Sequence, residues 1–425
     1  MQENKVLKIS TSGSVDDGKS TLIGRILYDT HSLKRDQLHA IQKNSEKRGY
    51  DYLDFSLATD GLVAEREQGI TIDVAHIYFS TDKRSFIIAD TPGHKEYTRN
   101  MITGASNSEV SLMLIDARNG VVEQTKRHFF INNLLRLENL VVVINKMDLV
   151  DYSEERFQKI VEDFKKLKDL ASFKEQKIHF IPVSALHGEN IVKPSPKLTW
   201  FNDKPLVSFL EEVSVDTSQD NQTRFQVQTV IRPKTDQFHD FRAYAGKLKG
   251  GSLEVGEKVK ILPSQMESRI KNIYFYNQSF KKASRGSSVA ITLEDDIQID
   301  RGDLIVKQNE LPQESKQINS MICWMDASSS LEANRFYWLQ HGVKMVKAKI
   351  ESVDSRLDIN QMGAPEKAEK LDLNDLGQVK IKLAQPIYFD DFDENKESGA
   401  FILIDMKSHA TAGVGFFNQN SISVG

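Results

Sequence analysis

The chain has 425 residues and a formal net charge of −4, with 39% hydrophobic and 27% charged residues. This length predicts two to four domains that each bury a core, and the weak negative charge argues against broad nucleic-acid binding. The one cysteine, Cys323, excludes an intrachain disulfide and a cysteine-based zinc site, and we expect it to be buried beside Trp324. No apolar run reaches the roughly 18 residues of a membrane span. The polar opening Met1–Lys5 is unlike a signal sequence, so we expect a cytoplasmic protein.

Residues 13–20 match the pattern G-x-x-x-x-G-K-[ST] of a loop that surrounds nucleotide phosphates. Glycine tolerates the positive φ angles that turn several backbone N–H groups toward a phosphate. Lys19 would place its charge on the β- and γ-phosphates, and the Ser20 hydroxyl could bind Mg²⁺. A strand at Val6–Ile9 and a helix after the loop are the context that this motif requires. The loop residues assigned to the nucleotide are Gly13, Ser14, Val15, Asp16, Asp17, Gly18, Lys19, Ser20 and Thr21.

Two further segments could complete a phosphate and magnesium site. The connection between residues 29 and 65 is too long for a structureless loop, so we expect one or two helices there. It leads to Thr71, whose hydroxyl could bind Mg²⁺, although this residue alone indicates no more than a turn before a strand. A buried strand at Ser85–Asp90 then ends in a carboxylate that is placed to hold Mg²⁺ through water. The residues assigned here are Asp90, Thr91, Pro92, Gly93, whose N–H can approach a γ-phosphate, and His94, a candidate catalytic residue.

A further motif predicts selection of guanine. Strands are expected at Val110–Asp116 and Leu140–Ile144, with a helix at Gln124–Leu137 between them. The second strand ends in Asn145-Lys146-Met147-Asp148. An aspartate there can accept hydrogen bonds from N1–H and the 2-amino group of guanine, which adenine does not offer in that arrangement. A site built on such bonds rejects the wrong base by about 10⁴- to 10⁵-fold.

The base site is expected to continue after the next helix and strand. The apolar spacing predicts a helix at Ser153–Leu170 and a strand at Ile178–Val183. This strand ends in Ser184-Ala185-Leu186, whose backbone amides could contact guanine O6. Pro205 is then expected at the first position of a closing helix.

The order of these elements predicts three domains. Alternating strands and helices over residues 1–215 indicate an α/β domain with a doubly wound, mostly parallel sheet, and the loop at residues 13–20 makes it a P-loop domain. After a polar linker, short β-rich runs with glycine turns predict a closed β-barrel over residues 223–309. Another β-rich stretch predicts a second barrel over residues 316–425. Within it, we expect the charged run Asp390–Glu397 to be a solvated loop.

Together the motifs resemble the translation-factor class of GTPases, whose architecture is a G domain followed by two β-barrels. The stretches at residues 13–25, 60–73 and 90–101 are more closely similar to the large, GTP-binding subunit of heterodimeric bacterial sulfate adenylyltransferase. Arg232-Pro233 and Phe241–Gly246 fit that family too. Elongation factors that deliver aminoacyl-tRNA usually have a histidine where Ser14 stands. The resemblance covers residues 5–310, and beyond them only Lys407–Gly413 is loosely similar to the closing motif of the family.

The resemblance implies that GTP hydrolysis drives the formation of adenylyl sulfate and pyrophosphate from ATP and sulfate, in sulfate assimilation. A smaller partner subunit would carry out the adenylyl transfer, so this chain would be the GTP-consuming member of a heterodimer. By the same resemblance Lys19 neutralises phosphate charge, Ser20, Thr71 and Asp90 hold Mg²⁺, and His94 positions the attacking water. The expected ligands are GTP and Mg²⁺, with neither a nucleic acid nor a membrane as partner. Two alternatives stay open: a translation factor that binds aminoacyl-tRNA, and a nucleotide-gated scaffold with negligible hydrolysis.

Overall fold

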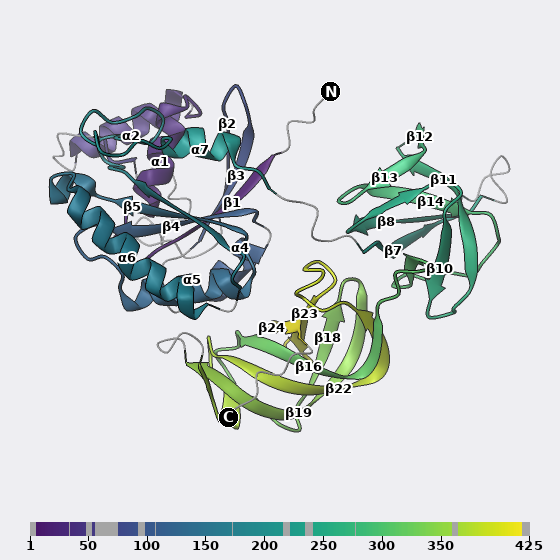
Figure 1. The fold of residues 1–425 in the computed structure, drawn as a ribbon. Helices are drawn as coiled ribbons and strands as arrows, with labels where there is room; N and C mark the ends of the chain where they lie inside the picture. The colour runs from purple at the N-terminus through teal and green to yellow at the C-terminus, as the bar shows by residue number, and fades with distance from the viewer. Residues whose placement is uncertain are drawn as a thin grey trace. The chain divides into compact units, whose positions relative to one another are not determined.

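The computed structural model describes residues 6–33, 35–47, 53–55, 75–91, 98–106, 108–171, 173–215, 222–233, 241–276, 278–358 and 364–418. Contacts between residues divide the chain into two compact units, the first of which contains residues 1–215. The first unit holds one α/β sheet, and the second holds two β-barrels (Figure 1). The predicted fold class is therefore confirmed. The domain boundaries that we place after residues 215 and 309 remain predictions.

The sheet of the first unit has six strands in the order β2-β3-β1-β4-β5-β6. Neighbouring strands are parallel except for β2 and β3, which are antiparallel. Every residue of β4 and β5 is buried, as expected for strands that are covered on both faces. The carboxyl ends of the parallel strands lie along one edge, where the predicted motifs begin. The strands are β1 (Leu7–Ser12), β2 (Ala75–Ser80), β3 (Ser85–Asp90), β4 (Val110–Asp116), β5 (Asn139–Asn145) and β6 (Lys177–Pro182).

Helices cover both faces of this sheet (Figure 1). On one face, Leu22 and Ile23 of α1 and Leu210 of α7 share a hydrophobic cluster with β1 and β3. On the other face, Phe129 of α5 and Phe164 of α6 pack edge to face, with ring centroids 5.1 Å apart. None of the described helices is long and apolar enough to cross a bilayer. The helices are α1 (Lys19–Asp29), α2 (Arg35–Lys47), α4 (Thr98–Ser106), α5 (Glu123–Leu134), the 3₁₀ helix η3 (Met147–Val150), α6 (Glu154–Leu170) and α7 (Leu206–Glu212).

The predicted helices are present, with small shifts at their ends. α5 and α6 correspond to the helices expected at residues 124–137 and 153–170, and α2 lies in the long connection after residue 29. Ser153 caps α6, because its hydroxyl accepts a hydrogen bond from the N–H of Arg156 at 3.2 Å. Pro205 is the N-cap of α7 rather than its first helical residue, since its ψ of 159° is extended. The position predicted for this proline was therefore wrong by one residue.

Each barrel of the second unit closes into a ring of six strands. The first barrel has the order β10-β15-β7-β8-β14-β11 and closes through β10 and β11, and β12 extends the sheet beyond β11. The second barrel has the order β18-β23-β24-β16-β22-β19 and closes through β18 and β19, with β20 beyond. Their cores contain Phe225 and Ile291 in the first barrel and Trp324 and Leu339 in the second. Cys323 is fully buried beside Trp324, as expected.

The strands of the first barrel's sheet are β7 (Arg224–Ile231), β8 (Ala243–Lys249), β10 (Lys258–Leu262), β11 (Glu267–Phe275), β12 (Gln278–Phe280), β14 (Ser288–Leu293) and β15 (Leu304–Lys307), and β9 (Ser252–Glu254) and β13 (Lys282–Ser284) pair as a separate two-stranded sheet. The strands of the second barrel's sheet are β16 (Gln313–Trp324), β18 (Phe336–His341), β19 (Lys344–Asp358), β20 (Ala364–Glu366), β22 (Leu376–Phe389), β23 (Ala400–Asp405) and β24 (Thr411–Phe417), and β17 (Leu331–Glu332) and β21 (Lys370–Leu371) pair as a separate two-stranded sheet.

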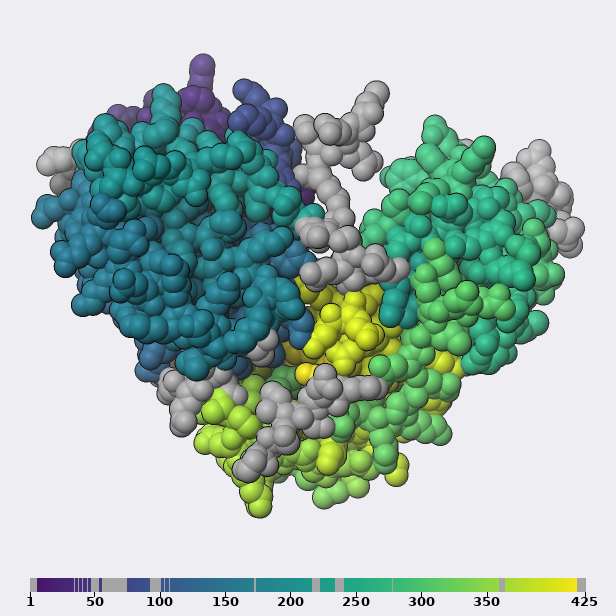
Figure 2. Space-filling view, viewed as in Figure 1, coloured from purple at the N-terminus to yellow at the C-terminus, as the bar shows by residue number. Residues whose placement is uncertain are grey.

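A buried ion pair joins the two barrels. The Arg224 guanidinium, at the start of β7, contacts the Asp390 carboxylate with an Nη2–Oδ1 distance of 2.7 Å, and the two side chains are 1% and 3% exposed. The Nη1 of Arg224 also donates to the carbonyls of Thr223 and Glu310, at 3.0 and 2.5 Å. Its Nη2 donates to Gln222 Oε1 at 2.7 Å. Figure 2 shows the first barrel in teal-green and the second in green to yellow.

The charged run Asp390–Glu397 is therefore not a solvated loop, and that prediction was wrong. Asp390 is 2% exposed and Phe392 is 8% exposed, with the Phe392 ring 4.6 Å from that of Phe416. Glu397 Oε2 lies 3.4 Å from Lys247 Nζ of the first barrel. A run of charges gives no sign of such partners, because Arg224 is 166 positions away from Asp390 in the sequence.

Candidate nucleotide-binding site

The loop between β1 and α1 has a backbone conformation that favours glycine. Gly18 has a φ of +90°, and a Cβ atom there would lie 2.5 Å from Asn145 Nδ2. The turn is closed by Asp17, whose Oδ2 accepts a hydrogen bond from the N–H of Ser14 at 2.6 Å. Burial raises the pKa of Asp17, although this bond and the charge of Lys19 oppose the shift. The Ser14 hydroxyl is buried and has no hydrogen-bond partner in the described part of the chain.

The other loop residues surround this turn. Val15 and Asp16 are exposed at its tip, and Gly13 is buried at the end of β1. Ser20 and Thr21 are half-buried in the first turn of α1. The loop N–H groups thus precede a helix N-terminus, where the helix dipole favours anions.

Lys19 is a buried cation that is held by neutral oxygens. Its Nζ donates to the carbonyls of Gly13 and Ser14 at 2.9 and 3.0 Å, and the residue is 7% exposed. It forms no ion pair with any residue that the structure describes. Burial lowers the pKa of the ammonium, although the nearby carboxylate of Asp90 opposes that shift. A buried ammonium in this setting favours a ligand that brings negative charge.

Asp90 lies at the carboxyl end of β3 and is 2% exposed. Its Oδ1 accepts a hydrogen bond from Thr11 Oγ1 at 2.9 Å. Thr11 also accepts the N–H of Thr91 at 3.3 Å, and the Thr91 hydroxyl donates to the Thr11 carbonyl. Thr11 therefore fixes the ends of β1 and β3 together, a role that no motif indicated. The other residues assigned to the phosphate and magnesium site, Thr71, Pro92, Gly93 and His94, lie outside the described ranges.

The side chain of Asn145 connects the phosphate loop with the expected base loop. Its Nδ2 donates to the carbonyl of Asp17 at 2.8 Å, and its Oδ1 accepts the N–H of Ala185 at 3.0 Å. Asn145 is 2% exposed, so both bonds are shielded from water. The three segments predicted to bind phosphate and guanine therefore lie together at one edge of the sheet.

Asp148 lies beside the loop after β6. Its Oδ1 accepts a hydrogen bond from Ser184 Oγ at 2.5 Å, and its Oδ2 lies 3.8 Å from His187 Nε2. Met147 is fully buried beneath this segment. The carbonyl of Leu186 accepts a hydrogen bond from Arg25 Nη1 of α1 at 3.4 Å. A carboxylate with one oxygen bonded to a hydroxyl still has acceptor sites for the two N–H groups that guanine presents.

Lys146 is held by a carboxylate that sequence reasoning missed. Its Nζ lies 3.0 Å from Asp116 Oδ2, and Arg118 Nη2 lies 2.7 Å from the same oxygen. Burial alone would raise the pKa of Asp116, but the hydrogen bonds from Arg118 and Lys146 outweigh it and hold that pKa at about 2. Asp116 is therefore a charged anchor for Lys146. The available signal was its position, because a carboxylate that ends a fully buried strand points to the functional edge of the sheet.

Two polar side chains of α5 lie behind the phosphate loop. Asn132 Nδ2 contacts Ser12 Oγ at 3.5 Å and donates to the carbonyl of His128 at 2.9 Å. Burial, together with the positive charge of Lys19, lowers the pKa of His128 to about 3, so the imidazole is neutral at pH 7. Within the described ranges, His128 Nδ1 and Asn132 Oδ1 have no hydrogen-bond partner.

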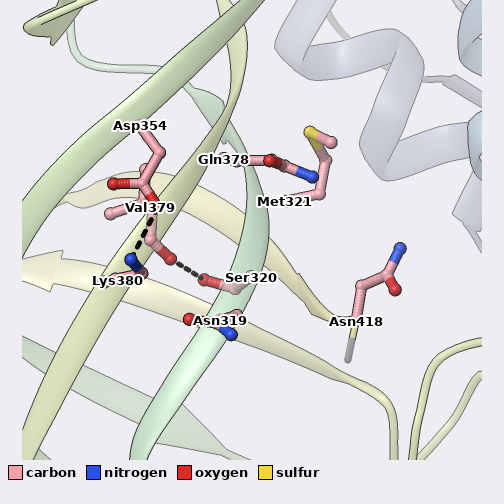
Figure 3. A pocket seen from close by; sticks show the side chains of 8 residues that line it. All are labelled: Asn319, Ser320, Met321, Asp354, Gln378, Val379, Lys380 and Asn418. Carbon is pink, nitrogen blue, oxygen red and sulfur yellow. Dashed lines mark hydrogen bonds and ion pairs between the residues drawn. The ribbon is translucent and has the colours of Figure 1, made fainter. Parts of the chain in front are cut away.

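A polar hollow of about 80 Å³ lies on the second barrel (Figure 3). Lys380 pairs there with Asp354, with an Nζ–Oδ2 distance of 3.5 Å, and Ser320 Oγ lies 3.4 Å from the Val379 carbonyl oxygen. Sites for drug-sized ligands are about 300–1,000 Å³, so this hollow is too small for a nucleotide. The site at the edge of the sheet is the better candidate.

The chain matches two known protein families. The family described as "Elongation factor Tu GTP binding domain" matches residues 4–228. The family described as "GTP-eEF1A C-terminal domain-like" matches residues 317–418. The match to known families thus extends past residue 310, the end of the region in which the sequence motifs closely resembled a known family.

Relatives with similar sequences cover almost the whole chain. The chain is 46% identical to sulfate adenylyltransferase subunit 1 of Colwellia psychrerythraea, over 98% of this chain and 89% of that protein. It is 42% identical to the protein of the same name from Shewanella woodyi, over 100% of this chain and 89% of that protein. It is also 43% identical to the bifunctional enzyme CysN/CysC of Mycobacterium tuberculosis, over 96% of this chain and 67% of that protein.

Among solved structures, the chain is similar to sup35 complexed with GMPPNP, with a TM-score of 0.43 and 20% identity, over 98% of this chain and 96% of that one. The sequence relatives decide the family. The chain belongs to the family of sulfate adenylyltransferase subunit 1, enzyme subunits that carry a GTP-binding domain of the elongation factor Tu type.

Proposed function

We propose that this chain binds and hydrolyses GTP, and that the hydrolysis drives formation of adenylyl sulfate and pyrophosphate from ATP and sulfate. The observation that carries nucleotide binding is Lys19, a buried ammonium that contacts only carbonyl oxygens within the described ranges. Phosphate oxygens would supply the negative charge that this position favours. The name of the relatives, sulfate adenylyltransferase subunit 1, supports the proposed reaction.

Phosphoryl transfer mainly requires positioning and charge stabilisation, so a covalent nucleophile is not needed. Lys19 and the loop N–H groups would hold the β- and γ-phosphates, with Gly93 next to the γ-phosphate and His94 orienting the attacking water. Ser20, Thr71 and Asp90 would hold Mg²⁺, because hydroxyl and carboxylate oxygens are ligands that it prefers, and the ion would add positive charge against the phosphates. The orphaned Ser14 hydroxyl is a further donor for the nucleotide.

We assign guanine selection to Asp148, supported by Asn145, Lys146, Met147 and the loop Ser184-Ala185-Leu186. The hydrogen bonds of Asn145 keep the phosphate loop and the base loop at a fixed separation. The sequence contains one G-x-x-x-x-G-K-[ST] loop, and its base motif selects guanine rather than adenine. The adenylyl transfer from ATP is therefore assigned to a smaller partner subunit, as the designation "subunit 1" of the relatives suggests.

A reconstitution experiment tests the coupling. Phosphate release from GTP and adenylyl sulfate formation are measured for the chain alone, and again with the small subunit encoded in the same genome. We expect slow GTP hydrolysis and no adenylyl sulfate from the chain alone. With the partner, the yield of adenylyl sulfate should rise only while GTP is hydrolysed, and a non-hydrolysable GTP analogue should support assembly without the sustained yield.

Variants make this experiment specific. Lys19→Ala should abolish the gain in yield, whereas Lys8→Ala, which removes an exposed lysine of β1, should not. His94→Ala should leave GTP affinity nearly intact and slow hydrolysis at least tenfold, which is about 1.4 kcal/mol of barrier. Unchanged turnover of His94→Ala with the partner present would assign this histidine a structural role. If the chain alone made adenylyl sulfate from ATP and sulfate, the proposed division of labour would be wrong.

A further inference from the structure

Three aromatic side chains project from the hairpin formed by β11 and β12 of the first barrel. Phe275, Tyr276 and Phe280 are 45%, 89% and 43% exposed. The Phe275 ring packs edge to face against the rings of Tyr276 and Phe280, with centroids 4.7 and 6.4 Å apart. We call these three residues the aromatic knob. Soluble proteins rarely leave such a cluster in water unless it binds something.

The knob continues the apolar side of the hairpin beyond the end of the barrel. Phe280 pairs directly with Ile273, a fully buried residue of the barrel core. Phe275 is two residues further along the same strand, so its side chain lies on the same face as that of Ile273. The apolar surface thus runs without interruption from the core to the exposed rings.

The segment that carries the knob is strongly basic. From residue 268 to residue 293 the sequence contains five arginines and lysines and no aspartate or glutamate, although the whole chain has a net charge of −4. Lys271, four residues before Phe275 on β11, and Lys281, directly after Phe280, are both exposed. Lys282 is exposed too and pairs with Glu254, at an Nζ–Oε1 distance of 2.8 Å. The five residues are Arg269, Lys271, Lys281, Lys282 and Arg285.

We propose that the aromatic knob and its basic border form the surface on which the smaller, adenylyl-transferring subunit docks. The complementary surface on that subunit is an apolar pocket bordered by aspartate and glutamate. This inference rests on the proposed function, which supplies the partner.

The shape of the knob favours a protein pocket over single-stranded nucleic acid. Nucleic-acid surfaces present separate flat rings on which successive bases stack. Here the Phe275 ring packs edge to face against both other rings, at interplanar angles of 74–75°, so the three rings form one cluster and not separate flat faces. Aromatic side chains that fill a desolvated pocket are the residues that dominate protein–protein affinity. The surrounding lysines would mainly set orientation and association rate through an acidic border.

The test compares the affinity of the small subunit for variants of the full-length chain, by calorimetry at two salt concentrations. Tyr276→Ser and Phe280→Ser remove exposed rings, and Lys271→Glu with Lys281→Glu reverses the border charge. The matched control is Phe336→Ser, which removes a ring that is 48% exposed on the second barrel. Affinity for a fluorescent GDP analogue and the melting temperature are measured for each variant to show that the fold and the nucleotide site are intact.

We expect each ring variant to raise the Kd for the small subunit at least tenfold, with GDP affinity unchanged and with no effect of Phe336→Ser. The charge reversal should slow association and reduce the salt dependence of the Kd. A small subunit that binds the parent chain and the knob variants equally well would overturn the docking surface and leave the proposed function intact. Failure of the parent chain to bind the small subunit at all would overturn the proposed partner itself. Loss of binding to polyuridylate RNA in the knob variants, with binding of the small subunit unchanged, would show a nucleic-acid surface instead.

Discussion

At the scale of single residues, Asp148 is the side chain to which we assign the choice of base. Asp148→Asn should weaken GTP binding and favour xanthosine triphosphate, because the amide can donate to the carbonyl that replaces the 2-amino group. Competition of the two nucleotides against a fluorescent GDP analogue measures this. Asp151→Asn, the same change at an exposed aspartate just after η3, should leave the preference for GTP unchanged. Equal affinity of the parent chain for ATP and GTP would contradict guanine selection.

The second prediction at this scale concerns Asp116, which we expect to act on the nucleotide through Lys146. Asp116→Asn and Lys146→Met should each speed GDP release about tenfold, since the first change weakens the anchor of the lysine and the second removes the lysine itself. If one residue acts through the other, the double variant should release GDP no faster than Lys146→Met alone. Stopped-flow measurements of the GDP release rate of each variant complete this double-mutant cycle. Melting temperatures show whether faster release is caused by unfolding. Multiplicative effects of the two changes would contradict the coupling.

Most candidate site residues could be picked out of the sequence because they belong to short, contiguous patterns, and their assignment to a nucleotide remains a prediction. The residues that position these side chains through contacts could not be predicted from the sequence. Thr11, Asp116 and Arg25 contact motif residues 79, 30 and 161 positions away, respectively, and a sequence pattern does not show which strand ends become neighbours. Such partners depend on strand order, which is a property of the folded sheet.

At the scale of elements, α1 depends on a close approach of the backbone at Phe55. A Cβ atom at Gly24 would lie 2.1 Å from the carbonyl oxygen of Phe55. Alanine favours a helix over glycine by about 1 kcal/mol, but overpacking costs about 1–3 kcal/mol and should outweigh it. Gly24→Ala should therefore lower the free energy of unfolding, as measured by urea denaturation. An increase would show that the Phe55 segment moves away without cost.

The longer elements were also predictable, whereas several short strands were not. β5 and α6 carry an uninterrupted buried run and a clear helical spacing, and both were placed within one or two residues. The strands β9, β12 and β13 have three residues each, too few to show an alternating pattern. They form only because a neighbouring strand supplies their hydrogen bonds.

At the scale of the whole molecule, the second unit depends on the ion pair between Arg224 and Asp390. Arg224→Ala would leave a buried carboxylate without its partner and should cost about 3–5 kcal/mol of stability. The double change Arg224→Met with Asp390→Leu should cost less, because it removes both charges. Lys282→Ala, which breaks an exposed pair with Glu254, should cost at most about 1 kcal/mol. Denaturation followed by tryptophan fluorescence compares the free energies of unfolding of these three proteins. A double variant that is less stable than Arg224→Ala would contradict this account.

Two buried histidines predict how stability depends on pH. Burial lowers the pKa of His128 to about 3 and that of His341 to about 4, both from an ordinary value of 6.5. The unfolded chain takes up these protons as pH falls below 6.5, and the folded chain does not until the pH reaches the lowered values. Each histidine therefore contributes stability above pH 6.5 that is lost toward pH 4, about 2 kcal/mol each by pH 5.

Thermal denaturation from pH 8 to pH 4.5 measures this loss. His128→Gln and His341→Gln should each flatten the pH dependence, even if they lower stability at neutral pH. His39→Gln, which replaces a surface histidine of α2, is the matched control and should leave the slope unchanged. If neither variant of the buried histidines changed the pH dependence of the melting temperature, the loss of stability in acid would have to come from other groups.

The carboxamide of Asn145 should couple binding at the two ends of a nucleotide. One rigid group bonds both the backbone of the loop that we propose surrounds the phosphates and the backbone of the loop that we propose faces the base. A displacement at either end is therefore passed to the other through a single planar amide. If guanosine and pyrophosphate bound as separate fragments, each would pay the entropy cost of fixing the Asn145 side chain and its two hydrogen bonds. The intact nucleotide would incur this cost only once. Its binding free energy would therefore be more favourable than the sum of the binding free energies of guanosine and pyrophosphate.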